Sequence, residues 1–139
     1  LLTMYGIDTG IKTEKFYSLS KLVREISGLQ LPSNRPVVGD MLFNVESGII
    51  ANWVKNCGME HILEVFPFHW ELVGQVPPEV VLGKNSGIDS IGIWLDRFGL
   101  KATNEQAQEI LLKVKQKSLQ KKNILTDNEF TEITSAVLG

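Results

Sequence analysis

The sequence is poor in the residues that form disulfides or bind metals. Cys57 is the only cysteine, so no disulfide can form within the chain, and a reducing, cytoplasmic setting is expected. The only histidines are His61 and His69, and their spacing from Cys57 matches none of the common structural zinc patterns. We therefore expect no metal site in this chain and an inert, buried thiol at Cys57.

An excess of one charge and long apolar runs are also missing. The chain has 14 Lys and Arg residues against 16 Asp and Glu residues, so no general attraction to nucleic acid or to an anionic membrane is expected. No apolar run approaches the roughly 20 residues that a membrane-spanning helix needs. A length of 139 residues allows one domain or two small subdomains. A TIM barrel takes about 250 residues, so none is expected within this chain.

The most informative stretch covers residues 80–89. An apolar segment suited to a short strand, Val80–Leu82, runs into the glycine-bounded segment Gly83–Gly87, and a helical pattern follows at once. Ser86 or Asn85 can cap that helix, and the two glycines permit a sharp turn and close approach by another backbone or a ligand. Lys84 could hold an anion such as a carboxylate at the helix N-terminus. The alternative is a solvated lysine at an ordinary strand-to-helix joint.

Periodicity and capping signals predict a mainly helical α+β fold in three segments. These are a linker with one helix over 1–36, a small mixed subdomain with two short strands over 37–84, and a three-helix subdomain over 85–139. The linker helix starts near Thr13 and ends at Gly28, with an apolar face formed by Phe16, Leu19, Leu22, Val23 and Ile26. The mixed subdomain is expected to contain a helix or helix-turn over 40–56 and strands over 62–66 and 80–82. Two of the last three helices open with capping boxes, at Thr103–Gln106 and Thr126–Glu129.

Two further groups of side chains, the lysines of residues 113–122 and the aromatic residues, could form binding surfaces. Lysines at 113, 115, 117, 121 and 122 could bind nucleic acid or a phosphate-bearing ligand, but a solvated helix face balanced by Glu105, Glu109, Asp127 and Glu129 is favoured. The aromatic residues interleave with aliphatic ones, which favours a core or a protein interface over a stacking platform. As a surface for self-association we single out Trp53, Trp70 and the segment Phe66–Phe68.

Several short motifs carry a resemblance to a known family. Leu82-Gly83-Lys84-x-Ser86-Gly87 resembles the Leu-Gly-Lys-His-Ser-Gly signature that follows the catalytic barrel in isopropylmalate, homocitrate and citramalate synthases. Other blocks follow in that family's order, and they are Tyr5–Ile11, Asn34-x-Pro36-Val37-Val38-Gly39, Glu46–Ile49, Glu71–Gly74, and Lys121-Lys122 followed by Thr126-Asp127. The resemblance spans nearly all of the chain. It implies the linker and communication region after the barrel, in a fragment of a longer protein.

The resemblance also implies partners and cofactors. In this family the module crosses over to cover the partner subunit's barrel, so the expected partners are its own TIM barrel and a second subunit in a homodimer, without nucleic acid or membrane. The divalent metal and acyl-CoA are expected only in the barrel, on an aspartate and a His-x-His pair that this chain lacks, so no cofactor is expected in the fragment. The substrate-adjacent candidates are Glu46, Ser47, Lys84, Asn85 and Ser86.

The sequence departs from the family at three histidines. Where the family commonly reads His-Glu-Ser-Gly-Ile-His, this chain has Val45–Ile50, and Asn85 replaces the histidine of the other motif. The resemblance gives the last histidine of the first motif an acid–base role in the partner's active site. Ile50 occupies that position and cannot transfer a proton, so no catalytic residue is expected in this chain.

Three hypotheses about function remain open at this point. In the first hypothesis, the chain is a non-catalytic part of an acyltransferase that condenses acyl-CoA with a 2-oxo acid. It would help to close the active site and to form dimer contacts, and it would be inactive without its barrel. Alternatively, it is the same part of a lyase-like or altered-substrate relative, for which Ile50 is an adaptation. The third possibility is an independent protein-binding module that uses its aromatic surface.

Overall fold

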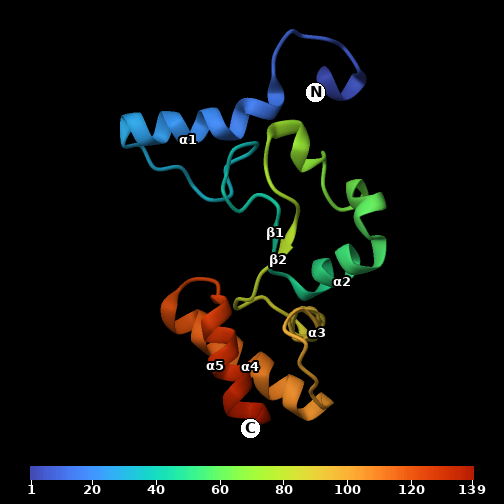
Figure 1. The fold of residues 1–139 in the computed structure, drawn as a ribbon, viewed down its shortest axis with the longest axis vertical. Helices are drawn as coiled ribbons and strands as arrows, with labels where there is room; N and C mark the ends of the chain where they lie inside the picture. The colour runs from blue at the N-terminus through green and yellow to red at the C-terminus, as the bar shows by residue number, and fades with distance from the viewer. The chain divides into compact units, whose positions relative to one another are not determined.

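The computed structural model describes residues 1–139, which form two compact units (Figure 1). Unit 1 comprises residues 1–44 and 61–78, and unit 2 comprises residues 45–60 and 79–139. Each unit thus combines two separated stretches of chain. The three consecutive segments expected from the sequence, 1–36, 37–84 and 85–139, stay a prediction.

Unit 1 contains one α-helix and several short 3₁₀ turns. Two turns, Thr3–Tyr5 and Thr13–Lys15, precede helix α1, Phe16–Ser27. Gly28 ends α1 at a φ of 71°, a conformation that glycine adopts without steric cost, as the sequence predicted. Thr13 does not cap α1, because it lies one 3₁₀ turn before the helix.

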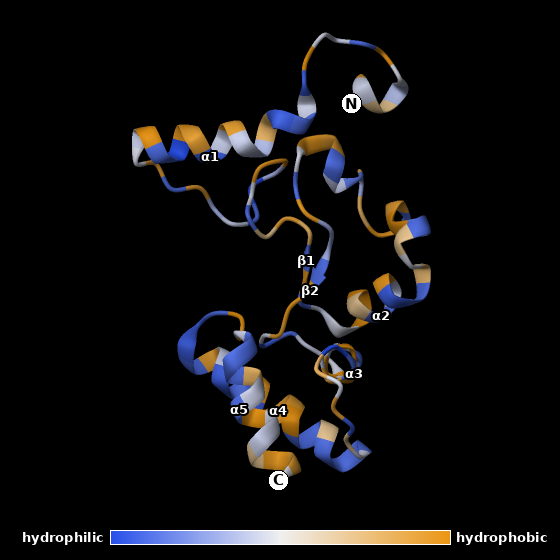
Figure 2. Ribbon diagram, viewed as in Figure 1, coloured by the Kyte–Doolittle hydropathy of each residue, from blue (hydrophilic) through white to orange (hydrophobic).

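The predicted apolar face of α1 exists but remains largely uncovered. Leu19, Leu22, Val23 and Ile26 are each at least half exposed, and Figure 2 shows hydrophobic residues recurring along the helix. Since α1 buries little apolar surface, its amphipathic pattern contributes less to the stability of unit 1 than an equally apolar helix in a closed core.

Aromatic rings form the core of unit 1. Phe43 is buried, and its ring centroid lies 5.4 Å from that of Phe66 and 5.7 Å from that of Phe68. Trp70 is also buried and only 7% exposed. The expectation that Trp70 lies on an exposed surface is therefore wrong, whereas Phe66 and Phe68 are half-buried and self-association stays a prediction. Of that set, Trp53 and Pro67 are exposed.

The strand expected over 62–66 is also absent. This stretch belongs to a 3₁₀ turn, Met59–Glu64, and a second 3₁₀ turn covers Trp70–Val73. The N–H groups of Val65 and Phe66 both donate to the carbonyl oxygen of Ile62, at 3.0 Å. These local hydrogen bonds satisfy the N–H groups of Val65 and Phe66, which are then not available to pair in a sheet. The Phe66 side chain instead packs against Phe43.

Unit 2 is mainly helical. It contains α2 (Gly48–Cys57), α3 (Ile88–Arg97), α4 (Asn104–Lys121) and α5 (Asp127–Leu138). Strands β1 (Asn44–Val45) and β2 (Glu79–Val80) pair in a minimal two-stranded sheet, in which the Val81 N–H donates to the Val45 carbonyl. The mainly helical α+β fold is thus confirmed. The partner of segment 80–82, however, is β1 rather than 62–66, and the helix expected over 40–56 begins only at Gly48.

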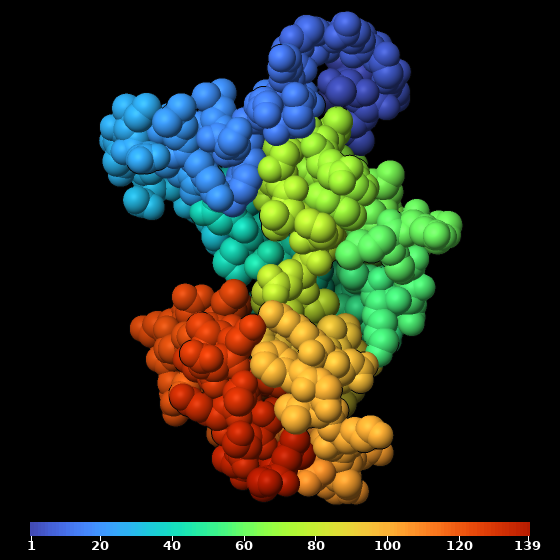
Figure 3. All heavy atoms as spheres, viewed as in Figure 1, coloured from blue at the N-terminus to red at the C-terminus, as the bar shows by residue number.

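The last three helices enclose one hydrophobic core. Its buried members are Leu82, Ile91, Trp94, Leu95, Ile110, Val114, Leu125 and Phe130. Phe130 is fully buried, with its ring 5.1 Å from Trp94 and 5.4 Å from Phe98. Burial of one such side chain stabilises a fold by about 1.5–3 kcal/mol. Figure 3 shows the side chains of these helices, from gold to red, packed against one another.

Both predicted capping boxes are confirmed. Thr103 accepts from the Gln106 N–H at the start of α4, and Thr126 accepts from the Glu129 N–H at the start of α5. The lysines of α4 are largely paired, with Lys113 on Glu109, Lys117 on Glu132 and Lys121 on Glu129. Most of this face is therefore the charge-balanced helix surface that the sequence favoured. No helix of the structure is long and apolar enough to cross a membrane.

In unit 1, the clearest electrostatic feature is a bidentate ion pair. Arg24 of α1 donates to both carboxylate oxygens of Asp40, at 2.8 and 2.9 Å, and the Tyr17 hydroxyl donates to one of them at 3.0 Å. These hydrogen bonds, with that from Arg24 the largest, lower the pKa of Asp40 from 3.8 to about 2. The carboxylate therefore stabilises unit 1 only while it is ionised.

This ion pair predicts an acid-side loss of stability. The pKa of Asp40 is lower in the folded chain than in the unfolded chain, so its ionised carboxylate stabilises the fold at any pH above the pKa of the unfolded chain. This stabilisation disappears as the pH falls towards about 2. Asp40→Asn should melt below wild type at neutral pH and approach it near pH 2, in thermal melts followed across that range. The control is Glu25→Gln, because Glu25 lies next to Arg24 on α1 but forms no ion pair. Parallel pH profiles for wild type and Asp40→Asn would contradict the assignment.

Candidate functional site

The candidate site is built where two motifs of unit 2 meet backbone to backbone. Gly48 is the first residue of α2, and Gly87 precedes the first residue of α3. A Cβ on Gly48 would lie 2.6 Å from the Gly87 Cα, and one on Gly87 would lie 3.0 Å from the Gly48 Cα. Only glycines permit this approach. The sequence predicted that Gly87 allows another backbone to come close, and the structure shows that this backbone is the first turn of α2.

Glu46 holds the turn between Leu82 and Gly87. Its Oε1 accepts from the Asn85 N–H at 2.9 Å, and its backbone carbonyl lies 3.4 Å from the Ser86 hydroxyl. A Cβ on Gly83 would collide with the Glu46 carboxylate, so this glycine provides the space that the carboxylate occupies. The predicted residues Glu46, Asn85 and Ser86 are therefore brought together by direct contacts.

Ser86 has a different role from the predicted one. Gly87, not Ser86 or Asn85, occupies the N-cap position of α3. The Ser86 hydroxyl is buried, 1% exposed, and accepts from the Gly83 N–H at 2.9 Å. The serine thus closes the turn upon itself, because one extra residue between the serine and the helix moves its side chain away from the helix end.

The extended segment before this turn is held on several sides. The Val80 carbonyl accepts from the Trp94 indole N–H at 2.7 Å, the Val81 N–H donates to Val45 at 2.9 Å, and the Leu82 carbonyl accepts from the Leu125 N–H at 2.8 Å. These bonds come from α3, β1 and the connection between α4 and α5. The position of Lys84 is therefore set by three separate parts of unit 2.

The remaining predicted residues lie at the edge of this arrangement. Lys84 is exposed and borders a pocket of about 320 Å³ together with Glu46. Ser47 occupies the N-cap position of α2, where its carbonyl accepts from the Ala51 N–H at 2.8 Å but its side chain makes no capping bond. Ile50 lies in the first turn of α2, half-buried, two residues after the contact between glycines.

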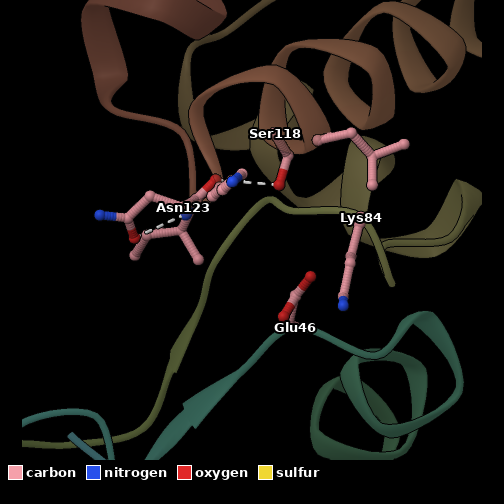
Figure 4. A pocket seen from close by; sticks show the side chains of 7 residues that line it. Glu46, Lys84, Ser118 and Asn123 are labelled. Carbon is pink, nitrogen blue, oxygen red and sulfur yellow. Dashed lines mark hydrogen bonds between the residues drawn. The ribbon is translucent and has the colours of Figure 1, made fainter.

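The pocket also contains residues that sequence reasoning did not single out. Figure 4 shows Ser118 of α4 and Asn123 of the following connection across the pocket from Glu46 and Lys84. The Ser118 hydroxyl donates to the Asn123 carbonyl at 2.9 Å. No local pattern connects these residues to Lys84, because the hydrophobic core and the bond between Leu125 and Leu82 bring the two regions together.

The structure offers no metal centre of its own. No group of three or more His, Cys, Asp or Glu side chains is placed to hold a metal ion. His69 instead stacks on Trp70, with ring centroids 3.7 Å apart. The residues present thus do not fit the divalent metal that the family resemblance implies.

Comparisons with known proteins agree with the motifs. The chain is 37% identical over 135 residues to a protein named as an (R)-citramalate synthase in Archaeoglobus fulgidus, which covers 97% of this chain and 26% of that protein. It is 35% identical over 138 residues to the homocitrate synthase of Methanocaldococcus jannaschii, covering 99% and 32%. The 2-isopropylmalate synthase of the same organism is 33% identical over 143 residues, covering 100% and 26%. No protein-family profile matches the chain.

These similarities define the class. A mainly helical chain that matches three kinds of synthase along its whole length is a partial region of the family that comprises citramalate, isopropylmalate and homocitrate synthases. The predicted resemblance is confirmed. The chain spans about a quarter to a third of the length of these relatives.

The glycine contact makes a direct stability prediction. Gly48→Ala should lower the free energy of unfolding by about 2 kcal/mol, because the new methyl group meets backbone atoms that move only if α2 shifts away from the turn. Gly92→Ala, within α3 and facing open space, should raise it by up to about 1 kcal/mol through helix propensity. Urea unfolding of both variants gives the comparison. A Gly48→Ala variant as stable as wild type would disprove the close approach.

Proposed function

We propose that this chain is the non-barrel part of a cytoplasmic acyltransferase that condenses an acyl-CoA with a 2-oxo acid. Its role is to close the active site of the catalytic barrel and to contribute contacts in a homodimer. In such a condensation the carbon next to the thioester carbonyl loses a proton and adds to the ketone carbon, whose oxygen takes up a proton to become the hydroxyl. Hydrolysis of the thioester then releases CoA and leaves a 2-hydroxy dicarboxylate. The similarity to citramalate, isopropylmalate and homocitrate synthases supports this reaction class.

The observation that carries the proposal is the junction of the two family motifs. Glu46 and Gly48 of one motif contact Asn85 and Gly87 of the other through a hydrogen bond and a backbone approach. This junction fixes the first turn of α2, where the family resemblance expects a histidine. A rigid support of this kind is what a module needs in order to present a side chain to another chain's active site.

Ile50 determines which role we propose for the first turn of α2. An isoleucine at this position supplies shape and apolar surface but no proton. We infer that the module retains the closing role of the motif without acid–base chemistry of its own. Adaptation of the parent enzyme to another substrate is the second candidate, and the same residue favours it.

The purified chain alone is predicted to be inactive. With acetyl-CoA and any common 2-oxo acid, thiol release should stay at background, because neither Ile50 nor Asn85 can transfer a proton at neutral pH. The assay follows free CoA with a thiol reagent, with enzyme-free mixtures as controls. Release above that background would show that the chain holds catalytic groups of its own.

Replacement of Ile50 tests the closing role. If the parent enzyme condenses its substrates without this proton-transfer group, Ile50→His in the full-length protein should raise the condensation rate, by up to about 10²–10⁴-fold. Ile50→Asn controls for polarity without titration, and Ile49→His places an imidazole on the adjacent, 81% exposed position.

Thermal melting of each variant must accompany the rates, since Ile50 is half-buried and a polar replacement can destabilise the helix. A higher condensation rate in Ile50→His, but not in Ile50→Asn or Ile49→His, supports the closing role. An unchanged condensation rate and an impaired native reaction in a stably folded Ile50→His protein would instead favour the altered-substrate relative.

A further inference from the structure

The pocket beside the Leu82–Gly87 turn has a lining that the two family motifs account for only in part. It has a volume of about 320 Å³, and its lining residues are Glu46, Lys84, Ser118, Leu119, Lys122, Asn123 and Ile124. All of them belong to unit 2. They come from the two family motifs, from the end of α4 and from the connection to α5. The pocket therefore forms only in the folded unit.

Two positive charges in this pocket lack a partner in the protein. Three lysines of α4 are paired with carboxylates, and Lys55 is paired with Asp96. Lys84 and Lys122 form no ion pair, although Glu46 borders the same pocket. The Glu46 carboxylate uses Oε1 to accept from the Asn85 N–H, which leaves Oε2 for another donor. The pocket thus combines two available amines with one available acceptor oxygen.

Lys122 reaches this position through an unfavourable backbone conformation. It follows α4 with φ 56° and ψ 36°, in the left-handed region where glycine or asparagine is usual at a helix end. A residue with a Cβ costs about 1 kcal/mol more than glycine there. Strained residues of this type concentrate at functional sites, and here the strain places a lysine, rather than a glycine, beside Lys84.

Apolar side chains complete the lining. Leu119 is 60% exposed, and Ile124 is half-buried. A ligand that fits this pocket therefore carries two negative groups for the two amines, a hydrogen-bond donor for Glu46, and a small alkyl group for Leu119 and Ile124. A third negative group would be repelled by the Glu46 carboxylate.

We propose that this pocket binds a 2-alkyl-2-hydroxy dicarboxylate, the product class of the proposed condensation. The choice of ligand rests on the proposed function, whereas the site itself rests on the side chains that line the pocket. Each carboxylate pairs with one of the amines of Lys84 and Lys122, and the hydroxyl donates to Glu46. Because Glu46 also holds the turn through Asn85, an occupied pocket is coupled to the junction that supports Ile50.

The binding test uses the purified chain and (R)-citramalate, which carries both carboxylates, the hydroxyl and a methyl group. Titration calorimetry should show saturable binding with a dissociation constant in the millimolar range, about that of a small ligand at an open site. 2-Methylsuccinate, which lacks only the hydroxyl, should bind about fivefold more weakly, the usual worth of one hydrogen bond. Inorganic phosphate tests whether charge alone suffices.

Variants distinguish the pocket from general electrostatic attraction. Lys84→Gln and Lys122→Gln should each weaken citramalate binding about fivefold, as for one exposed ion pair. Lys101→Gln, an exposed lysine outside the pocket, should leave binding unchanged. Lys122→Gly should weaken binding yet raise the melting temperature, because glycine removes the left-handed strain. Opposite changes in binding and stability cannot come from misfolding.

Three results would overturn the proposal. They are the absence of saturable binding up to about 10 mM citramalate, equal binding of phosphate and citramalate, and equal affinity in the Lys84 variant and the Lys101 control. None of these bears on the proposed function, because that is tested by the rates of the Ile50 variants in the full-length protein. Failure of the pocket and failure of the closing role are thus distinguishable.

Discussion

The approach of Gly48 to Gly87 is the constraint on which the candidate site depends. At this point two backbones lie closer than any side chain would allow, and the contact aligns the start of α2 with the turn before α3. The hydrogen bond between the two motifs lies at the same place. Glu46 lies two residues before one glycine, and Asn85 lies two residues before the other, so their hydrogen bond closes the same junction a second time.

The junction works because the surrounding core is closely packed. Leu82, immediately before the turn, is fully buried among Ile91, Ile110 and Val114, and its carbonyl is bonded to Leu125. A shift of the turn would expose these apolar side chains and break a buried backbone hydrogen bond, at a cost of about 1–3 kcal/mol for the bond alone. The turn is therefore anchored to the three-helix core beside it.

The family resemblance expects histidines at three positions of these motifs, and this chain has other residues there. Val45 is buried beside β2, Ile50 is half-buried in α2, and Asn85 uses its backbone N–H, rather than its side chain, to bind Glu46. None of these contacts requires an imidazole. The junction of the two motifs therefore forms without a titratable side chain at any of these three positions.

The sequence alone determined the starts of α4 and α5, the end of α1 and the family. The capping boxes at Thr103 and Thr126 and the glycine after α1 act through neighbours within a few residues, so local patterns reveal them. Only the tertiary structure decided the rest. Segment 62–66 has the composition of a strand, yet it turns because no partner strand lies beside it, and Ser86 braces a turn instead of capping a helix. Lys84 and Lys122 lie 38 residues apart in the chain but line one pocket, and no local pattern records an arrangement of that kind.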